Sequence, residues 1–344
     1  MVNATMKILV IENQTDRSRD PWWMRYVGPC SKRKGVTVHA LAISDKLSTG
    51  NLSAIWGVLA LVVSGRRYDW ILTPQDGLAT MGFGIARRFV PFRRPRHAVL
   101  EFITREEGTT LHDRFKYALL RFALHSVDRL ICSSRGEVEY YREHLRMRRD
   151  QVRFAPLGGD PSWTARSAPG PQDYILSAGR TLRDYGTLMR AIEGTGYRLV
   201  VVTSPRCLTG LSIPSGVEVQ LDIEASSLLQ LIQGARFVVL PLQDRKISCG
   251  QRLLLMAMAQ GKCCVVSRVP GMIDYVTDGV DGVLVPPRDP DAMRAAIRDL
   301  WPDQARLDAM GSQAQAAFEA RYRIEHHAES VLSLLTSDGG AVFD

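Results

Sequence analysis

The sequence has no apolar run long enough to cross a bilayer. A spanning helix needs about 20 consecutive apolar residues, whereas the longest candidate, residues 55–63, is much shorter and contains a glycine. The first residues lead directly into a predicted strand, without the succession of basic region, apolar region and cleavage site that a signal peptide has. These absences predict a cytoplasmic protein, with peripheral attachment to the inner face of the membrane as an open alternative.

The cysteines lack the spacing of a metal site or a disulfide scaffold. The chain has 6 cysteines, at positions 30, 132, 207, 249, 263 and 264, and none forms a C-x-x-C pair. We therefore expect reduced, structural thiols and no metal site. The glycine fingerprint of dinucleotide-binding domains is also missing after the first predicted strand. No bound cofactor is expected.

Positive charge is concentrated in the first half of the chain. The formal net charge is +8 overall, and residues 1–160 carry 26 Lys and Arg against 16 Asp and Glu, whereas the remainder is slightly acidic. A basic half beside a near-neutral half indicates an anionic partner for the first half.

The order of predicted elements indicates an α/β protein of two domains. At 344 residues the chain exceeds what one ordinary core holds. A stretch rich in Gly, Pro and Ser, residues 158–172, separates two runs of alternating strands and helices. We predict domains over residues 1–165 and 166–315, a C-terminal helix over residues 316–335, and a flexible tail over residues 336–344. Strands are predicted at residues 6–12, 36–43, 68–73, 98–103, 128–132, 152–156, 174–178, 198–203, 217–221, 237–242, 263–266 and 282–285.

The segment over residues 236–267 has the most informative local pattern. A short apolar run ends in a polar loop, a Leu-, Met- and Ala-rich helix follows, Gly261 can end that helix, and a second apolar run comes next. This is a βαβ unit, so its strands should be parallel. The loop between the first strand and the helix then lies where open α/β sheets bind anionic ligands. Cys249 is the one thiol placed at a predicted helix start, where a thiolate is favoured.

The arginine-rich segment over residues 87–97 admits three interpretations. It can be a solvated basic loop, or it can contact a membrane surface through Phe89 and Phe92 while arginines meet anionic lipid. Nucleic acid is the weakest interpretation, because no recognition motif accompanies the charge. We take as acceptor or membrane candidates Trp22, Trp23, Phe89, Phe92, Arg93, Arg94 and Arg96.

Four segments of the second half together form a recognisable pattern: S-A-G-R-T at residues 177–181, G-Q and L-L-x-A-M-A-x-G-K-x-x-V-V within residues 250–266, P-G-M-I-D-Y-V at residues 270–276, and D-G-V-D-G-V-L-V-P-P-R-D at residues 278–289. With them the second half resembles the C-terminal domain of GT-B glycosyltransferases, and most of all glycosyltransferase family 4. The first half matches the family only in its alternating order of strands and helices. The resemblance implies two Rossmann-like doubly wound domains facing a cleft, the first for the acceptor and the second for the nucleotide-sugar, with the terminal helix crossing back.

The resemblance also implies a function and a set of site residues. The function is retaining, metal-independent transfer of a sugar from a nucleotide-sugar to a lipid-linked or saccharide acceptor, in glycolipid or polysaccharide assembly. Arginine suits the diphosphate because its guanidinium binds two oxygens at once. The candidate catalytic residues are Arg180, Arg183, Lys246 and Glu101. The candidate donor-binding residues are Gly179, Arg180, Ser204, Leu221, Ser248, Cys249, Gly250, Gln251 and Met256.

The chain departs from the family pattern at several of these positions. Ser248 and Met256 occupy the places of the usual glutamate pair, and Tyr185 occupies the place of the usual lysine, whose charge Arg183, Arg245 or Lys246 could replace. The usual histidine of the first domain has no plain match; Glu101 and His112 lie in that region. These departures leave a second hypothesis open, a catalytically silent relative that scaffolds or regulates a partner glycosyltransferase. A sugar-nucleotide epimerase is a weaker third hypothesis.

Overall fold

The computed structural model describes residues 6–14, 27, 30–31, 34–44, 67–73, 77–89, 95–104, 108–165 and 172–336. The chain divides into two compact units, one formed within Met1–Pro156 and Glu325–Asp344, the other by Leu157–Ile324. The predicted features that lie outside the described residues are Trp22, Trp23, Phe92, Arg93, Arg94 and the tail.

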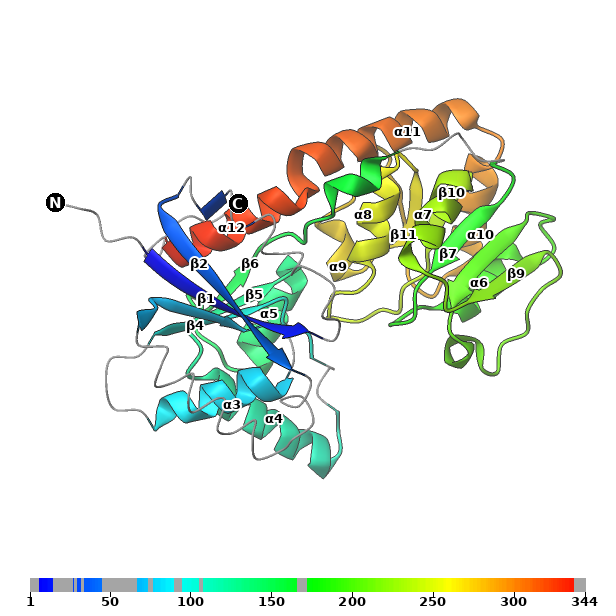
Figure 1. Ribbon diagram of the computed structural model, residues 1–344. Helices are drawn as coiled ribbons and strands as arrows, with labels where there is room; N and C mark the ends of the chain where they lie inside the picture. The colour runs from blue at the N-terminus through cyan, green and yellow to red at the C-terminus, as the bar shows by residue number, and fades with distance from the viewer. Residues whose placement is uncertain are drawn as a thin grey trace. The chain divides into compact units, whose positions relative to one another are not determined.

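The first unit is built around a six-stranded parallel sheet (Figure 1). Its strands run in the order β2-β1-β3-β4-β5-β6. They are β1 (Met6–Gln14), β2 (Val36–Ser44), β3 (Trp70–Thr73), β4 (Arg96–Leu100), β5 (Arg129–Cys132) and β6 (Val152–Phe154). The described helices of this unit are α3 (Gly77–Arg88), α4 (Leu111–Leu124), α5 (Arg135–His144) and α12 (Ile324–Thr336), whose first residue belongs to the second unit.

The faces of this first sheet are covered by helices from opposite ends of the chain. Ile8 and Val10 of β1 pack in one cluster with Val331 and Leu332 of α12. The alternate residues Leu9 and Ile11 point to the other face, in a cluster with Phe83 of α3. Buried parallel strands carry apolar residues on both faces for this reason. The C-terminal helix is thus a structural part of the first unit.

The second unit has a parallel sheet of six strands in the order β12-β11-β10-β7-β8-β9. The chain begins in the middle, at β7, builds outward to β9, and then returns to β10 on the other side of β7. Its strands are β7 (Ile175–Ala178), β8 (Leu199–Thr203), β9 (Val217–Leu221), β10 (Phe237–Leu240), β11 (Cys264–Ser267) and β12 (Val283–Val285). Its helical segments are η3 (Pro161–Thr164), α6 (Tyr185–Ile192), η4 (Pro205–Leu208), α7 (Ala225–Gly234), α8 (Gln251–Ala259), α9 (Pro270–Ile273), α10 (Pro290–Leu300), α11 (Gln304–Ala317) and the π-helical turn η5 (Phe318–Tyr322).

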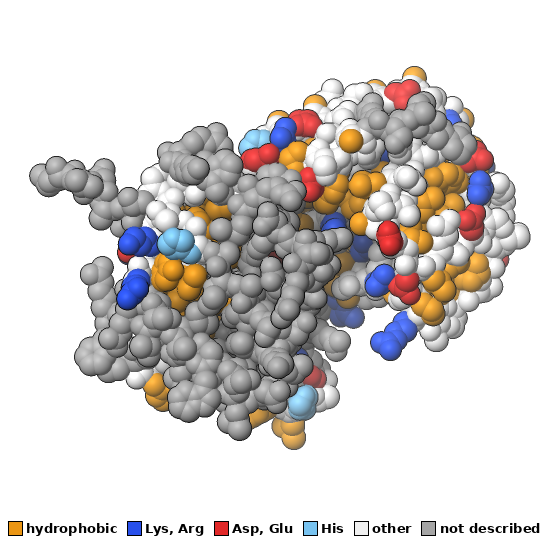
Figure 2. All heavy atoms as spheres, viewed as in Figure 1, with side chains coloured by type: hydrophobic (Ala, Val, Ile, Leu, Met, Phe, Trp, Pro, Cys, Tyr) orange, Lys and Arg blue, Asp and Glu red, His pale blue; other side chains and the backbone are white. Residues whose placement is uncertain are grey.

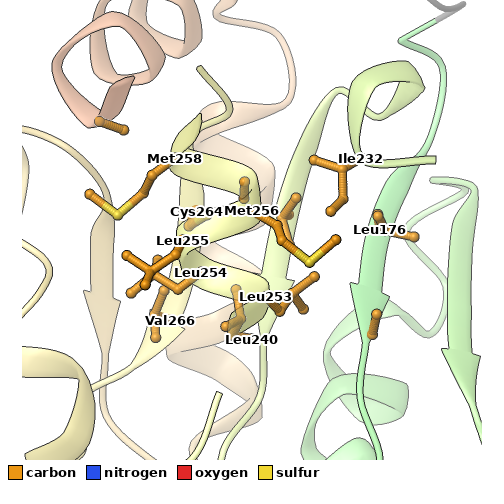
Figure 3. Packing of buried hydrophobic residues seen from close by; sticks show 14 of the residues in the cluster. Leu176, Ile232, Leu240, Leu253, Leu254, Leu255, Met256, Met258, Cys264 and Val266 are labelled. Atoms are coloured by element: carbon orange, nitrogen blue, oxygen red, sulfur yellow. The ribbon is translucent and has the colours of Figure 1, made fainter. Parts of the chain in front are cut away.

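Two hydrophobic clusters lie on the two faces of this second sheet. Val238 and Leu240 of β10 pack with α8, whose residues Leu253 to Ala259 are all buried (Figure 3). Phe237 and Val239 of the same strand point the other way, into a cluster with α6 and α10. The continuous apolar pattern of β10 is explained by this burial on both sides.

The predicted strands are confirmed, each within a few residues of its expected ends. The predicted C-terminal helix differs, because the chain leaves α-helical geometry at η5 and Arg323 has an extended backbone. Tyr322 causes part of this break, since its ring stacks on Tyr275 at 5.2 Å and its hydroxyl donates to the Asp274 carbonyl at 3.2 Å. The two segments that connect the units also pair, because the Ile324 N–H donates to the Gly159 carbonyl at 2.9 Å.

Candidate functional site

The candidate site lies at the carboxyl edge of the second sheet, beyond β7 and β10. The strand order reverses between these two strands, and ligands of open α/β sheets bind at such reversal points. The loops that follow the two strands are bonded together: Asp184 N–H donates to the Pro241 carbonyl at 2.9 Å, and Gln243 N–H donates to the Leu182 carbonyl at 3.0 Å. The two loops therefore form one surface.

Arg183 is held between these loops by three contacts. Its Nε donates to the Ala178 carbonyl at 2.9 Å, and its Nη1 contacts the Thr181 carbonyl at 3.0 Å and Cys249 Sγ at 3.3 Å. Within the described residues its Nη2 makes no hydrogen bond, so this nitrogen can donate to an anion. The guanidinium covers Gly179 so closely that an added Cβ would lie 2.3 Å from Nη2. Gly179 also has φ +127, so both the close approach of Arg183 and the backbone conformation require glycine at this position.

The helix α8 presents an uncapped amino end beside Arg183. Its N-cap residue is Gly250, in the left-handed region with φ +98, and within the described residues no side-chain cap hydrogen bond forms there. The first N–H groups of a helix need acceptors, and the helix dipole makes them favourable partners for negative charge. An added Cβ at Gly250 would lie 3.6 Å from Arg183 Nη1, which shows how close the cation and the helix end are. The pair forms an anion cradle, which we define as Arg183, Cys249, Gly250 and the first turn of α8.

Tyr185, at the position of the family's lysine, points into the protein instead of toward a ligand. The residue is 1% exposed, and its hydroxyl donates to the Gly179 carbonyl at 2.8 Å. Thr203 Oγ1 donates to the same carbonyl at 2.8 Å. Burial raises the pKa of Tyr185, so the side chain stays neutral. Tyr185 and Thr203 thus fix the loop that carries Arg183, a supporting role that sequence patterns did not reveal.

Arg180 is oriented differently from Arg183. Its guanidinium lies 2.8 Å from the carboxylate of Asp222, the residue after β9, and the two side chains are 61% and 60% exposed. An exposed pair of this kind contributes little stability and can exchange partners. Arg180 can therefore leave Asp222 for a diphosphate, but in this structure the Asp222 carboxylate already offsets its charge. The contacts of Arg183 within the described residues include no carboxylate.

The remaining donor-binding candidates divide between the loop surface and the core. Ser204 and Leu221 lie at the carboxyl ends of β8 and β9, on the same edge as the cradle. Ser248 is 3% and Gln251 5% exposed, and the Gln251 side chain donates to the Gly271 carbonyl at 3.2 Å. These two residues brace the loop against α9. Lys246 is exposed on the loop between β10 and α8.

Met256 lies in the hydrophobic core. It is 2% exposed and extends from α8 toward Ile232 and the strand that carries Leu176 (Figure 3). In the family the corresponding glutamate is expected on the donor. The sequence here has an apolar side chain at this position because the side chain is packed between the helix and the sheet. In this position the Met256 side chain is not available to a ligand on the loop surface.

Glu101 marks the carboxyl edge of the first sheet. It follows β4 with φ +50, an uncommon backbone conformation for a residue other than glycine. Its carboxylate lies 3.6 Å from Nε2 of His327, a buried residue of α12. The other ring nitrogen, Nδ1, lies 2.8 Å from the Pro156 carbonyl, which can only accept, so we assign the proton to Nδ1. This pairing between distant parts of the chain was not expected from the sequence.

The acceptor or membrane candidates are described only in part. Phe89 is 74% exposed at the end of α3. Arg96 begins β4, and its guanidinium lies over the Trp70 ring at 5.5 Å. In the part of the chain that the structure describes, no helix is both long and apolar enough to span a bilayer. No cluster of metal-ligating side chains occurs among the same residues.

Thiol reactivity provides a test of the cradle. We expect Cys207 and Cys249 to react with a small thiol reagent in the native protein, because both are half-buried, whereas the other four cysteines are buried. Burial raises the pKa of the Cys207 thiol, but hydrogen bonds from Ser204 and Thr203 have the larger combined effect and lower the pKa. Burial raises the pKa of the Cys132 and Cys264 thiols. Mass spectrometry after timed labelling identifies the modified thiols. A nucleotide diphosphate that fills the cradle should slow labelling of Cys249; unchanged labelling under saturation would contradict the assignment.

Comparisons with known proteins agree with this architecture. The family profile described as "Glycosyl transferase 4-like domain" matches residues 8–158, and the profile described as "Glycosyl transferases group 1" matches residues 172–303. Since the two profiles together account for most of the chain, the protein belongs to the GT-B glycosyltransferases of the group 1 type. The GT-B fold expected from the sequence is confirmed.

Individual relatives are distant. The D-rhamnosyltransferase WbpZ of Pseudomonas aeruginosa is 28% identical over 220 residues, a match that covers 58% of this chain and only 56% of that protein. The structure of sucrose-phosphate synthase from Thermosynechococcus elongatus aligns with a TM-score of 0.75 at 17% identity, covering 96% of this chain and 98% of that one. HepE of Anabaena, solved in complex with UDP and glucose, aligns with a TM-score of 0.71 at 15% identity, covering 96% of this chain and 99% of that one. At these identities the structures establish the fold alone.

Proposed function

We propose that this chain is a retaining glycosyltransferase. It moves a sugar from a nucleotide-sugar donor to a lipid-linked or saccharide acceptor in the assembly of a glycolipid or polysaccharide, and it needs no metal ion. The second unit binds the donor and the first unit binds the acceptor. Family membership and the similarity to the D-rhamnosyltransferase WbpZ support the transfer reaction. The complexes of HepE with UDP and with UDP-glucose support a nucleotide-sugar donor.

The observation that carries the proposal is the anion cradle. Negative charge develops on the leaving nucleoside diphosphate as the bond to the sugar breaks, and fixed positive groups stabilise this charge most. Arg183 is fixed by its bonds to the Ala178 and Thr181 carbonyls, and its Nη2 has no partner among the described residues. The first turn of α8 adds backbone donors and the positive end of the helix dipole. Together they supply the charge that a divalent metal supplies in other transferases.

In this proposal the catalytic residues are Arg183, Arg180, Lys246 and Glu101. Arg183 and the uncapped helix bind the diphosphate, and Arg180 leaves Asp222 to assist. Lys246 is carried by the exposed loop of the same edge. Glu101 is the carboxylate at the carboxyl edge of the first sheet, 3.6 Å from Nε2 of His327, and it can take a proton from the acceptor hydroxyl. Retention at the anomeric carbon is proposed from the family resemblance.

The experiment is a donor screen followed by product analysis. Thermal shifts are measured with UDP-, GDP-, ADP- and TDP-linked sugars, since a ligand at about 100 times its Kd stabilises by about 2.7 kcal/mol. The donor that binds is then supplied with saccharide and lipid-linked acceptors, with and without EDTA, and the anomeric configuration of the product is read by NMR. Transfer with retention that survives EDTA is expected. Lack of a shift with every donor would refute the donor site.

A scaffold or regulator without catalytic activity is the second candidate. The burial of Met256 at the position of the family's ribose-binding glutamate favours it. This candidate predicts nucleotide binding without transfer or hydrolysis under any acceptor condition. The same screen separates the two, because binding and turnover are measured on one preparation.

A further inference from the structure

Helix α4 has a second apolar face, in addition to the one it packs on its own unit. Tyr117, Leu120, Ala123 and Leu124 form the buried face. Along the opposite side of the helix the exposed apolar residues are Leu111 (82%), Phe115 (71%), Leu119 (41%) and Phe122 (42%). At helical spacing these four make a stripe roughly 100° wide. A water-facing helix normally carries polar residues there, so this stripe calls for a partner.

Basic residues border the stripe on both sides. Arg114 and Lys116 are exposed on opposite flanks of α4. Arg88, at the end of α3, lies over the Phe122 ring at 4.4 Å, and the next residue, Phe89, is 74% exposed. We define the α4 outer face as Leu111, Phe115, Leu119 and Phe122 with the flanking Arg88, Phe89, Arg114 and Lys116. Figure 2 shows hydrophobic side chains at the lower edge of the view, where Figure 1 draws α4.

The α4 outer face is rigidly supported. Thr110 caps the helix by accepting from the Asp113 N–H, and the carboxylate of Asp113, the acidic residue of α4, accepts from the Thr110 hydroxyl at 2.6 Å. Ser126, just past the helix, donates to the Gly84 carbonyl of α3 at 2.7 Å. Nearby, Arg87 bridges to Asp128 at 2.8 Å. The exposed aromatics therefore project from a fixed platform and lose little conformational entropy when they are buried.

We propose that the α4 outer face docks on the headgroup region of an anionic lipid bilayer. An exposed apolar stripe between cationic flanks is the pattern of a helix that lies in the membrane interface, where apolar side chains enter the acyl boundary and Lys and Arg meet acidic headgroups. The charge of the chain is complementary to such a surface, because residues 1–160 carry 26 Lys and Arg against 16 Asp and Glu. A protein partner would not require basic residues on both flanks.

The direction of α4 gives docking a consequence for the reaction. The helix begins at Leu111, soon after β4 and Glu101 at the carboxyl edge of the first sheet, and ends at Leu124, before β5. Docking through its outer face lays α4 along the lipid surface, and the amino end of the helix follows Glu101 closely in the chain. A lipid-linked acceptor can then present its head to Glu101 without leaving the bilayer. This consequence rests on the proposed function, whereas docking itself does not.

Vesicle binding of the full chain tests the proposal without any donor. The protein is sedimented with vesicles of phosphatidylcholine alone, or of phosphatidylcholine with about 30% phosphatidylglycerol, at rising salt. We expect binding to the anionic vesicles that weakens between about 0.1 M and about 0.5 M salt. Phe115→Glu with Leu119→Glu should reduce the partition coefficient about tenfold or more, since apolar burial is replaced by repulsion. Arg114→Glu with Lys116→Glu should abolish the preference for anionic lipid.

The controls make each outcome decisive. Val280→Glu changes a residue that is 49% exposed in the second unit, and it should bind vesicles like the wild type. Thermal melts establish that each variant is folded. Absence of wild-type binding to anionic vesicles overturns the proposal, as does undiminished binding by the Phe115 and Leu119 variant. Self-association that this variant abolishes, without vesicle binding, would assign the face to a second copy. Transfer assayed with a soluble acceptor reports separately on the proposed function.

Discussion

Replacing Arg183 with alanine is expected to lower kcat/KM for sugar transfer about 100-fold to 1,000-fold, the effect of removing a fixed donor from a developing anion. The guanidinium is locked by the Ala178 and Thr181 carbonyls and covers Gly179. It therefore needs no reorganisation when charge appears on the leaving diphosphate. Steady-state kinetics with the donor found by the screen measure the loss.

Two further variants separate charge from geometry. Arg183→Lys keeps the positive charge but loses the planar fork, so we expect an intermediate loss. Arg298→Ala removes an exposed arginine of α10, away from the carboxyl edge, and should leave kcat/KM unchanged. If Arg183→Ala stays within about threefold of the wild type, a contribution of less than about 1 kcal/mol, the cradle is not the leaving-group site.

Met256→Glu is expected to destabilise the protein by about 3 kcal/mol or more, because it places a carboxylate in an apolar core. Met256 is 2% exposed and belongs to a hydrophobic cluster with Leu, Val and Ile side chains. Met256→Leu keeps volume and polarity nearly constant, and should cost less than about 1.5 kcal/mol. Urea titration of the three proteins measures the difference in unfolding free energy.

The alternative outcome for Met256→Glu is informative in its own right. A variant as stable as the wild type that binds the donor more tightly would mean that residue 256 can reach the ribose. The site would then be a weakened form of the family's usual one. Loss of stability without a gain in affinity would mean that the core was rebuilt around methionine, and that the loop surface recognises the nucleotide in another way.

The contact between Glu101 and His327 links the carboxyl edge of the first sheet to the C-terminal helix. His327 is buried, and its Nδ1 is engaged by the Pro156 carbonyl. Its Nε2 lies 3.6 Å from the Glu101 carboxylate. The helix that completes the core of the first sheet thus also places a side chain beside a candidate catalytic carboxylate. Its contribution could not be anticipated from Glu101 and its neighbours in sequence.

Local sequence patterns were sufficient for the architecture. Apolar runs such as Phe237–Leu240 are long enough to define buried strands, and Gly261, with φ +66, ends α8 as its position indicated. Alternating strand and helix patterns leave few topologies, because parallel crossovers are right-handed and short. The break at η5 was missed, since the stacking of Tyr322 on Tyr275 is a tertiary contact that no helical periodicity reports.

The sequence by itself determined the fold class, the edge of the sheet where the candidate site lies, and the departures at Ser248, Met256 and Tyr185. The α/β class and the sheet edge follow from periodicity and spacing along the chain, whereas the three departures follow from the resemblance to the glycosyltransferase family. Only the tertiary structure decided where each side chain lies: Arg183 is held between two loops, Arg180 is paired with Asp222, and Met256 is in the core. The tertiary structure also showed that α4 has a second apolar face that is open to solvent. In the sequence, the residues of this face have the same spacing as those of a buried helix face. Periodicity shows which residues share a face, whereas packing against distant segments decides which face is buried.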